Sequence, residues 1–217
     1  AYAMQQLRIE SQIILASKSP RRRFLMENAG LEFTVCPSRV KEADFEIGAP
    51  RDYVRTLAEA KARDVGDLYP DGWVIGADSI VWADDRLLEK PRSVDAARHM
   101  MEQLSGRTHS VFTGFCVFCR TRAHLHADVA ETAVTFKPLS PAEMEWYIAT
   151  DEPYDKAGGY AIQGLGSFMI QRIQGSYTNV VGLPLCELMD HLIRQDVIRP
   201  DPNAPNWRSN ASVPASW

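Results

Sequence analysis

The segment QIILASKSPRRRFLMENAG, residues 12–30, shows how this chain begins to fold, because it joins a strand to a helix through a short polar loop. The apolar run QIILAS predicts a buried strand. Ser19 is a favourable N-cap and Pro20 suits the first helical position. A helix is therefore expected from Pro20 to Ala29, with Gly30 closing its C-terminus. A strand that leads directly into a helix is a typical first unit of an α/β fold.

This helix begins among positive side chains, although a helix N-terminus already carries about half a unit of positive charge. Such cations oppose the helix dipole unless an anion normally lies beside them. The hydroxyl, backbone N–H and guanidinium groups of the Ser-x-Ser-Pro-Arg-Arg run suit phosphate. The alternative is a solvated basic surface, and Arg23 is interpreted as a surface residue or an ion-pair partner. The four cations are Lys18, Arg21, Arg22 and Arg23.

Strands and helices alternate along the rest of the chain without a clear repeat, which predicts a mixed α/β architecture. One apolar segment, GWVIGADSIVW at 72–82, is expected to form a strand that Asp78 interrupts, followed by a second short strand and a turn at Asp84 and Asp85. Ser140 and Glu143 form a capping box. Other strands are expected at 31–36, 109–119 and 129–136, and other helices at 51–68, from near Ser93 to before Gly106, at 140–148 and from Pro184.

Length and composition indicate a single globular domain, placed at residues 4–197, with the possibility of two lobes. The chain has 217 residues, 45% of them hydrophobic, and a net charge of -4, so it has no overall basic footprint for nucleic acid. It has no apolar run near 20 residues and no signal-peptide pattern, which predicts a cytoplasmic protein that does not bind membranes. Residues 1–3, ahead of Met4, are interpreted as a cloning remnant, and the Pro-, Asn- and Ser-rich tail at 198–217 is expected to be poorly ordered.

Cys116 and Cys119 form a C-x-x-C motif, which could indicate zinc or redox chemistry. No second ligand pair with suitable spacing accompanies it, and the HLH run at 124–126 is the only rival partner. The surrounding segment is uniformly apolar and β-prone. Reduced, mostly buried thiols in a strand are therefore favoured.

Asp78 is the first candidate for chemistry, because an ionised carboxylate in a buried strand is costly unless a cation or metal pairs with it. A metal ligand or a general base would explain it, and the alternative is a strand-end aspartate that caps a turn. Lys61 and Lys90 could reach phosphate oxygens, while Glu42 could add a second carboxylate for a cation such as Mg²⁺. Each of these three could equally be a surface residue.

The glycine-dense segment DKAGGYAIQG, residues 155–164, allows backbone to approach a ligand or to turn tightly. Gln163 could read a base edge, because its amide both donates and accepts hydrogen bonds. The alternative is that the polar residues here only build turns.

Seven motifs follow one another along the chain: SKSPRR (17–22), AEAKA (58–62), GADSIV (76–81), EKP (89–91), LSGRTHSVFTG (104–114), DKAGGYAIQG (155–164) and GSYTNVVGLPL (175–185). In this order they resemble the Maf family of nucleoside triphosphate pyrophosphatases, and the match runs from about Ile13 to Ile193. The resemblance implies an α/β fold like that of the inosine triphosphatase group, with a mixed twisted sheet, flanking helices and two lobes around a nucleotide cleft. It implies hydrolysis of a nucleoside triphosphate to the monophosphate and pyrophosphate.

The resemblance also assigns roles to matching residues. Asp78 matches the proton acceptor, and Glu42 is similar to an upstream acidic residue that, with Asp78, would hold Mg²⁺ or Mn²⁺. Whether Asp78 acts as base or as metal ligand stays open. The phosphate-binding positions are matched by Ser19, Arg21, Arg22, Lys61 and Lys90, and those linked to substrate preference by Arg21, Ser79 and Gln163.

The DKAGGYAIQG form resembles the branch of the family that acts on dTTP and UTP. Two departures from the family pattern are Ser79, where Thr is usual, and Glu89, where Gly is usual. The resemblance implies a house-cleaning role linked to arrest of cell division, and a homodimer. Two alternatives remain: a non-catalytic nucleotide-binding regulator of septum formation, or a pyrophosphatase specific for 7-methyl-GTP or deaminated purines.

Overall fold

The computed structural model describes residues 7–201, so the expected remnant at 1–3 and most of the expected C-terminal tail lie outside the described residues. Seven strands form one mixed sheet in the order β3-β2-β4-β6-β7-β8, with β5 also paired to β4. β2 pairs in parallel with β3 and β4, and the other neighbours are antiparallel. The predicted mixed α/β fold is thus confirmed. The strands of this sheet are β2 (Ile13–Leu15), β3 (Thr34–Val35), β4 (Trp73–Ala83), β5 (Arg86–Leu88), β6 (Thr108–Cys119), β7 (His124–Phe136) and β8 (Ile170–Gln174).

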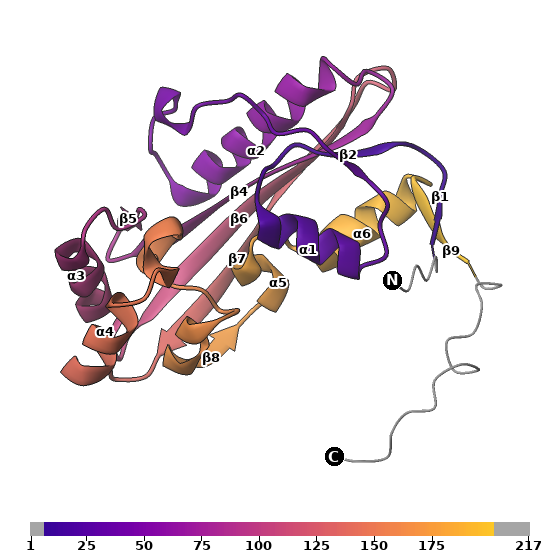
Figure 1. Ribbon diagram of the computed structural model, residues 1–217. Coiled ribbons are helices and arrows are strands. Elements are labelled where there is room, and N and C mark those ends of the chain that lie inside the picture. Colours follow the sequence, from indigo (N-terminus) through magenta and orange to yellow (C-terminus); the bar gives the residue numbers. More distant parts are fainter. Residues whose placement is uncertain (1–6, 202–217) are drawn as a thin grey trace, which may run out of the picture.

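The helices cover both faces of this sheet, with α2 on one face and α1, α5 and α6 on the other (Figure 1). Helices α1 and α6 lie toward one end of the long strands, and α3 and α4 toward the other. The predicted caps of α1 and α4 are confirmed, because Ser19 accepts a hydrogen bond from the Arg22 N–H and Ser140 forms a capping box with Glu143. The helices are α1 (Pro20–Asn28), α2 (Pro50–Gly66), α3 (Val94–Leu104), α4 (Pro141–Ile148), α5 (Tyr177–Val181) and α6 (Leu185–Arg194), with short 3₁₀ turns η1 (Glu42–Asp44), η2 (Glu152–Asp155), η3 (Ala157–Gly159) and η4 (Leu165–Met169).

β4 is one continuous strand, so the prediction that Asp78 interrupts it is wrong. Asp78 stands opposite Gly114 of β6 in an unbroken antiparallel ladder. The backbone of Asp78 pairs as that of any other residue would. Its side-chain charge is balanced by a cation from another element, so the strand does not need to break. The predicted turn is confirmed at Asp84 and Asp85, which have φ of 50° and 57° and lead into β5.

The strand expected at 31–36 is limited to Thr34 and Val35, both exposed at the edge of the sheet. A further correction concerns the tail expected from residue 198. Ile198–Pro200 forms β9, which pairs with β1 (Leu7–Ile9) in a separate two-stranded sheet. Ile198 is completely buried, so an apolar side chain anchors this part of the chain before the Pro- and Asn-rich composition begins.

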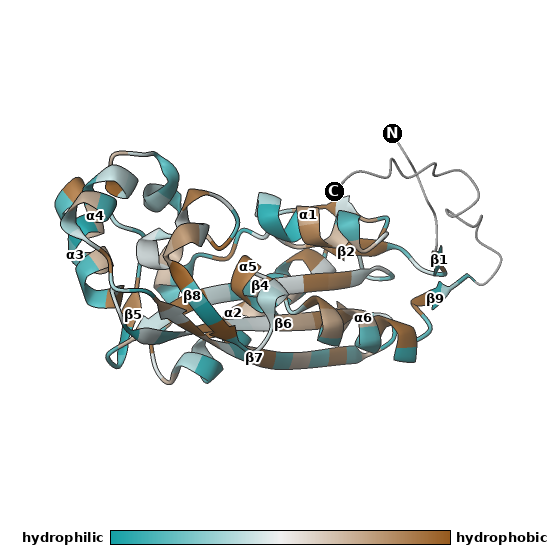
Figure 2. Cartoon of the chain, turned by 90° about the horizontal axis from the view of Figure 1, so that it is seen from below, coloured by the Kyte–Doolittle hydropathy of each residue, from teal (hydrophilic) through white to brown (hydrophobic). Residues whose placement is uncertain are grey.

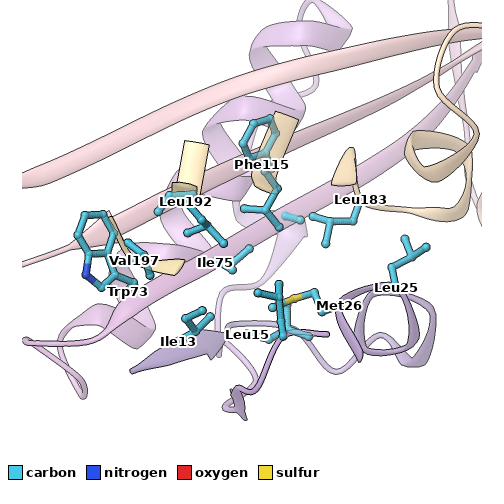
Figure 3. Close-up of a cluster of buried hydrophobic side chains, with 14 of the residues drawn as sticks. Ile13, Leu15, Leu25, Met26, Trp73, Ile75, Phe115, Leu183, Leu192 and Val197 are labelled. Atoms are coloured by element: carbon cyan, nitrogen blue, oxygen red, sulfur yellow. The ribbon is translucent and has the colours of Figure 1, made fainter. Parts of the chain in front are cut away.

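Alternating residues of the long strands point to opposite faces of the sheet and supply hydrophobic clusters on both. Figure 3 shows part of one core, in which Ile75 and Phe115 lie among side chains of α1 and α6, such as Met26 and Leu192. The other face packs Val74, among others, against α2. Figure 2 shows the matching alternation of hydrophilic and hydrophobic residues along β7. Ala77 belongs to the α1 and α6 side, so Asp78 points toward α2 and Ser79 toward α1.

Two glycines let α2 sit directly on the sheet. A Cβ added at Gly76 would lie 2.3 Å from the carbonyl oxygen of Ala58, and one at Gly114 would lie 2.4 Å from the carbonyl oxygen of Val54. Both distances are far below van der Waals contact, so no larger residue fits without moving the α2 backbone. This close approach brings Lys61, in the next turn of α2, over β4.

Cys116 and Cys119 are both buried in β6, which confirms the interpretation of structural thiols. Burial raises the pKa of the Cys116 thiol to about 12. Within residues 7–201, no cluster of three or more His, Cys, Asp or Glu side chains is arranged to hold a metal ion. The same part of the chain contains no helix long and apolar enough to cross a membrane.

A histidine cluster between β7 and α6 predicts that the fold loses stability in mild acid. The Nε2 atoms of His124 and His191 are 3.0 Å apart, and the rings of His126 and His191 stack with centroids 4.0 Å apart. Burial, followed by the charges of the other two histidines and of Arg194, lowers the pKa of His191 to about 4, against a smaller opposing effect of Asp190.

In the unfolded chain, the imidazole of His191 has its ordinary pKa near 6.5. Between pH 6.5 and 4 the unfolded chain therefore binds more protons at His191 than the folded chain does, so the free energy of unfolding falls as the pH falls through this window. We expect a loss of about 1 to 2 kcal/mol attributable to His191. Urea unfolding at pH 7 and pH 4.5 should show a smaller pH effect for His191→Gln than for the unaltered chain. His99→Gln, at an exposed histidine, should leave the pH effect unchanged. Equal pH effects in all three proteins would contradict the assignment.

Candidate active site

The predicted site residues gather where one edge of β4 has no strand beside it. β2 pairs with β4 only as far as Ile75, and β5 pairs with it again from Val81. Within the described residues, no strand pairs with this edge of β4 between these points, and Ser79 in this stretch bonds to Arg22 of α1. Ligands of open α/β sheets bind beyond the carboxyl ends of parallel strands, at a position of this kind.

Lys61 joins the two predicted carboxylates. Its Nζ atom donates to Asp78 Oδ1 at 2.5 Å and to Glu42 Oε1 at 2.9 Å. The three residues come from α2, β4 and η1, and the side chains of Lys61 and Asp78 are only 12% and 8% exposed. The structure therefore brings together three residues that the sequence singled out separately, around one ammonium group.

The two carboxylates differ in their affinity for protons. Burial raises the pKa of Asp78, and the charge of Glu42 adds to this effect, while Lys61 and Arg22 oppose it incompletely. Burial alone would also raise the pKa of Glu42, but Lys61 reverses the shift with help from the charge of Lys90, so that this pKa is lowered. A carboxylate with a raised pKa beside one with a lowered pKa is a common arrangement for a proton acceptor and its charged neighbour.

Arg22 is buried and bonds to three parts of the protein. Its Nε donates to the carbonyl oxygen of Gly182 at 2.8 Å, Nη1 to Ser17 Oγ at 3.2 Å and Nη2 to Ser79 Oγ at 3.0 Å. These bonds use three of the five guanidinium donors. Arg22 therefore ties α1 to β4 and to the turn after α5, so it shapes the site as well as bringing charge to it.

Of the remaining predicted residues, Arg21 and Lys90 lie close enough for their charges to act on Arg22 and Glu42. Ser19 caps α1, and the Nε of the half-buried Arg21 donates to the carbonyl oxygen of Val181 at 3.3 Å. Lys90 is exposed and acts on Glu42 through its charge. Gln163 is half-buried between η3 and η4. Arg23 pairs with Glu27 on the surface of α1, in agreement with its interpretation as an ion-pair partner.

Sequence reasoning missed the polar network beneath Ser79. The Ser79 hydroxyl pairs with Thr113 Oγ1 at 2.8 Å, and Thr113 donates to the backbone oxygen of Asn179 at 3.1 Å. Asn179 is completely buried and donates to Val111 and Thr132. The signal available in the sequence was the polar Thr113 within the otherwise apolar run at 111–119, with no indication of its partner.

Tyr53 was also missed. The charges of Asp78 and Glu42 contribute, after burial, to raising the pKa of its phenol. Its spacing of eight residues from Lys61 puts both on one face of α2 and could have revealed it.

A cavity of about 490 Å³ borders the segment that carries Glu42, but none of the predicted site residues lines it. We therefore do not assign it to the site. Its lining residues are Arg39, Val40, Lys41, Asp44, Phe45 and Asp64.

Comparison with known proteins bears out the resemblance found in the sequence. A model of the Maf family, described as Maf-like protein, matches residues 12–195. A protein of Syntrophus aciditrophicus named dTTP/UTP pyrophosphatase is 44% identical over 184 residues, which cover 85% of this chain and 90% of that protein. A protein of the same name from Citrifermentans bemidjiense is 47% identical over 182 residues, covering 84% and 94%.

Among solved structures, the Ham1 protein of Staphylococcus aureus aligns with 85% of this chain and 99% of its own, at 12% identity and a TM-score of 0.44, which is too weak to bear on fold or function. The predicted likeness to the inosine triphosphatase group stays a prediction. The family match and the sequence identity to relatives of nearly the same length are sufficient by themselves: this chain belongs to the Maf family.

Proposed function

We propose that this protein is a nucleoside triphosphate pyrophosphatase that prefers dTTP and UTP and releases the nucleoside monophosphate and pyrophosphate. The observation that carries the proposal is the buried Asp78, with its raised pKa, held by Lys61 next to Glu42 and within reach of the charge of Arg22. The names of the relatives, dTTP/UTP pyrophosphatase, support the same reaction.

In the proposed reaction, a water molecule attacks the α-phosphorus of the nucleotide. Asp78 accepts the proton of that water, the new P–O bond forms, and the bond from the α-phosphorus to the oxygen bridging to the β-phosphorus breaks. Pyrophosphate leaves with that oxygen. Lys61 holds the Asp78 carboxylate in one orientation before attack. A fixed proton acceptor is in the reactive geometry more often than a mobile one.

The phosphate groups are assigned to the basic side chains around this centre. The α1 N-terminus offers backbone N–H groups together with Ser19, Arg21 and the donors of Arg22 that remain free. Lys61 and Lys90 approach from α2 and from the segment after β5. Such preorganised cations stabilise the charge that builds up on the phosphoryl oxygens.

The donors present also fit a divalent cation. Asp78 and Glu42 are close enough to bind the same ammonium group, and Mg²⁺ typically binds one or two carboxylates together with substrate phosphates. We therefore propose that Glu42 and one carboxylate oxygen of Asp78 would hold Mg²⁺ or Mn²⁺ when nucleotide is bound, while the other Asp78 oxygen accepts the proton of the attacking water. The cation would neutralise phosphate charge and lower the pKa of a bound water.

We assign the preference for one nucleobase over another to Gln163, Arg21 and Ser79. The Gln163 amide can pair with the donor and acceptor edge of thymine or uracil. Ser79 acts indirectly, since its hydroxyl is already bonded to Arg22 and Thr113. We expect it to influence the base through the position of Arg22 and of the Gly182 turn. A homodimer, a cytoplasmic location and a role in cell-division arrest remain predictions.

The proposed function is tested by incubating the protein with nucleoside triphosphates and Mg²⁺ or Mn²⁺ and separating the products. The panel contains dTTP, UTP, ATP, 7-methyl-GTP and dITP. We expect monophosphate and pyrophosphate, formed fastest from dTTP and UTP. Tight binding without turnover would instead identify a non-catalytic regulator, and fastest turnover of 7-methyl-GTP or dITP would overturn the proposed base preference.

A further inference from the structure

Glu152 lies outside the seven motifs and has no part in the proposed reaction. Its carboxylate closes the loop that carries Gln163 by binding the backbone at the far end of that loop. Its Oε1 atom accepts hydrogen bonds from the Gly166 N–H at 2.7 Å and the Tyr147 hydroxyl at 3.0 Å. Its Oε2 atom accepts from the Leu165 N–H at 2.9 Å. One carboxylate therefore holds two consecutive backbone amides of η4 and a buried side chain of α4. Hydrogen bonds to an ionised acceptor are among the stronger ones in proteins.

The loop closed in this way, residues 152–166, contacts two different hydrophobic clusters. Tyr160 belongs to the core beneath α3 and α4, while Ile162 packs against the core of α1 and α6. Gln163 follows Ile162 directly. The loop is also tied to the segment next to Lys90, because the Gly158 N–H donates to the carbonyl oxygen of Glu89 at 3.2 Å.

The backbone next to Gln163 makes this closure specific. Gly164 has φ of 131°, a conformation that L side chains rarely adopt. A Cβ at Gly164 would lie 2.5 Å from Glu152 Oε2, so the carboxylate is packed against the bare glycine backbone. The position of Glu152 thus fixes where the chain turns immediately after Gln163.

We infer that Glu152 is a positioning residue for base selection, which holds the Gln163 turn in the orientation that reads the base. The inference rests on the proposed role of Gln163. Glu152 binds the backbone of its own loop through both carboxylate oxygens, so its removal should free the base-reading side of the site and leave the phosphate-binding side, around α1 and Lys61, in place.

The test compares Glu152→Ala and Glu152→Gln with Asp151→Asn, the matched control at the exposed neighbouring carboxylate. For each protein, kcat and KM are measured with dTTP, UTP and ATP, and inorganic tripolyphosphate is used as an inhibitor that lacks a base. We expect Glu152→Ala to raise KM for dTTP and UTP about tenfold and to narrow the preference over ATP. The inhibition constant for tripolyphosphate should change less than about twofold, because phosphate binding is intact.

Glu152→Gln should fall between Glu152→Ala and the unaltered chain, because it keeps one acceptor oxygen and loses the other. It also keeps the size of the side chain, so it carries the test if Glu152→Ala does not fold, as judged by circular dichroism. The inference would be overturned if a folded Glu152 variant kept the full preference for dTTP and UTP over ATP. An equal loss of kcat for all three nucleotides would overturn it as well.

Two further variants separate this inference from the proposed function. Gly164→Ala places a methyl group against the Glu152 carboxylate and should narrow the base preference in the same way. Gln163→Ala tests the base-reading role itself. If Gln163→Ala leaves the preference unchanged, the proposed role of Gln163 fails and the inference fails with it. If Gln163→Ala narrows the preference and the Glu152 and Gly164 variants do not, only the inference about Glu152 is wrong.

Discussion

Asp78→Asn is expected to lower kcat for dTTP hydrolysis about 1,000-fold, because an amide cannot accept the proton of the attacking water. Asparagine has nearly the same size as aspartate, and its carbonyl oxygen can still accept the hydrogen bond of Lys61. KM for dTTP should therefore change much less than kcat. Steady-state kinetics with pyrophosphate release as the readout provides the measurement.

The matched control for this variant is Asp71→Asn, at an exposed aspartate just before β4. It replaces the same functional group, a carboxylate, outside the proposed site and should retain normal turnover. Near-normal kcat in Asp78→Asn, or an equal loss in both variants, would contradict the assignment of Asp78.

Asp78→Asn should leave the free energy of unfolding unchanged or increase it. Burial raises the pKa of Asp78, which means that the folded protein holds its ionised form at a cost in free energy. Removing that charge relieves the cost, whereas Glu42 remains as a partner for Lys61. A site that becomes more stable when its function is lost is typical of catalytic residues. Urea unfolding of Asp78→Asn near neutral pH tests this expectation.

The local signals in the sequence were reliable where the structure depends on neighbours in the chain. Ser19 and Pro20 start α1, and Ser140 and Glu143 start α4, because an N-cap and its backbone partner are only three residues apart. The turn at Asp84 and Asp85 is equally local. Short-range geometry of this kind needs no knowledge of the rest of the fold.

The prediction for β4 was wrong because the partner of Asp78 is 17 residues away in the sequence, on another element. A single sequence does not show that Lys61 arrives from α2, so the pairing that keeps Asp78 within a continuous strand is not visible in it. For the same reason β9 was missed, since only its pairing with β1, close to the other end of the described chain, makes Ile198 a buried residue.

Arg22 shows why the charge pattern at α1 was only partly understood. The sequence suggested that its positive charge at a helix N-terminus requires an external anion. In the structure, oxygens of Ser17, Ser79 and Gly182 accept three of its hydrogen bonds, so much of its directional bonding is satisfied within the protein. The net positive charge remains, and it acts on Asp78 as well as on any phosphate nearby.

Gly114→Ala is expected to destabilise the fold by about 3 kcal/mol, because overpacking a tight contact costs energy and here the obstacle is backbone. The added Cβ would lie 2.4 Å from the carbonyl oxygen and 2.5 Å from the carbonyl carbon of Val54, so α2 must shift away from the sheet. Lys61 lies on α2 two turns later and would move with it. We therefore expect kcat/KM for dTTP to fall as well, although Gly114 has no functional group.

The control is Gly48→Ala, for which no atom lies within 4 Å of the added Cβ. Its free energy of unfolding should stay within about 0.5 kcal/mol of the unaltered chain. Urea unfolding and dTTP kinetics on both variants give the comparison. If Gly114→Ala were as stable and as active as Gly48→Ala, the close seating of α2 on β6 would not be what holds Lys61 over Asp78, and the link from the glycines of the sheet to the geometry of the site would have to be abandoned.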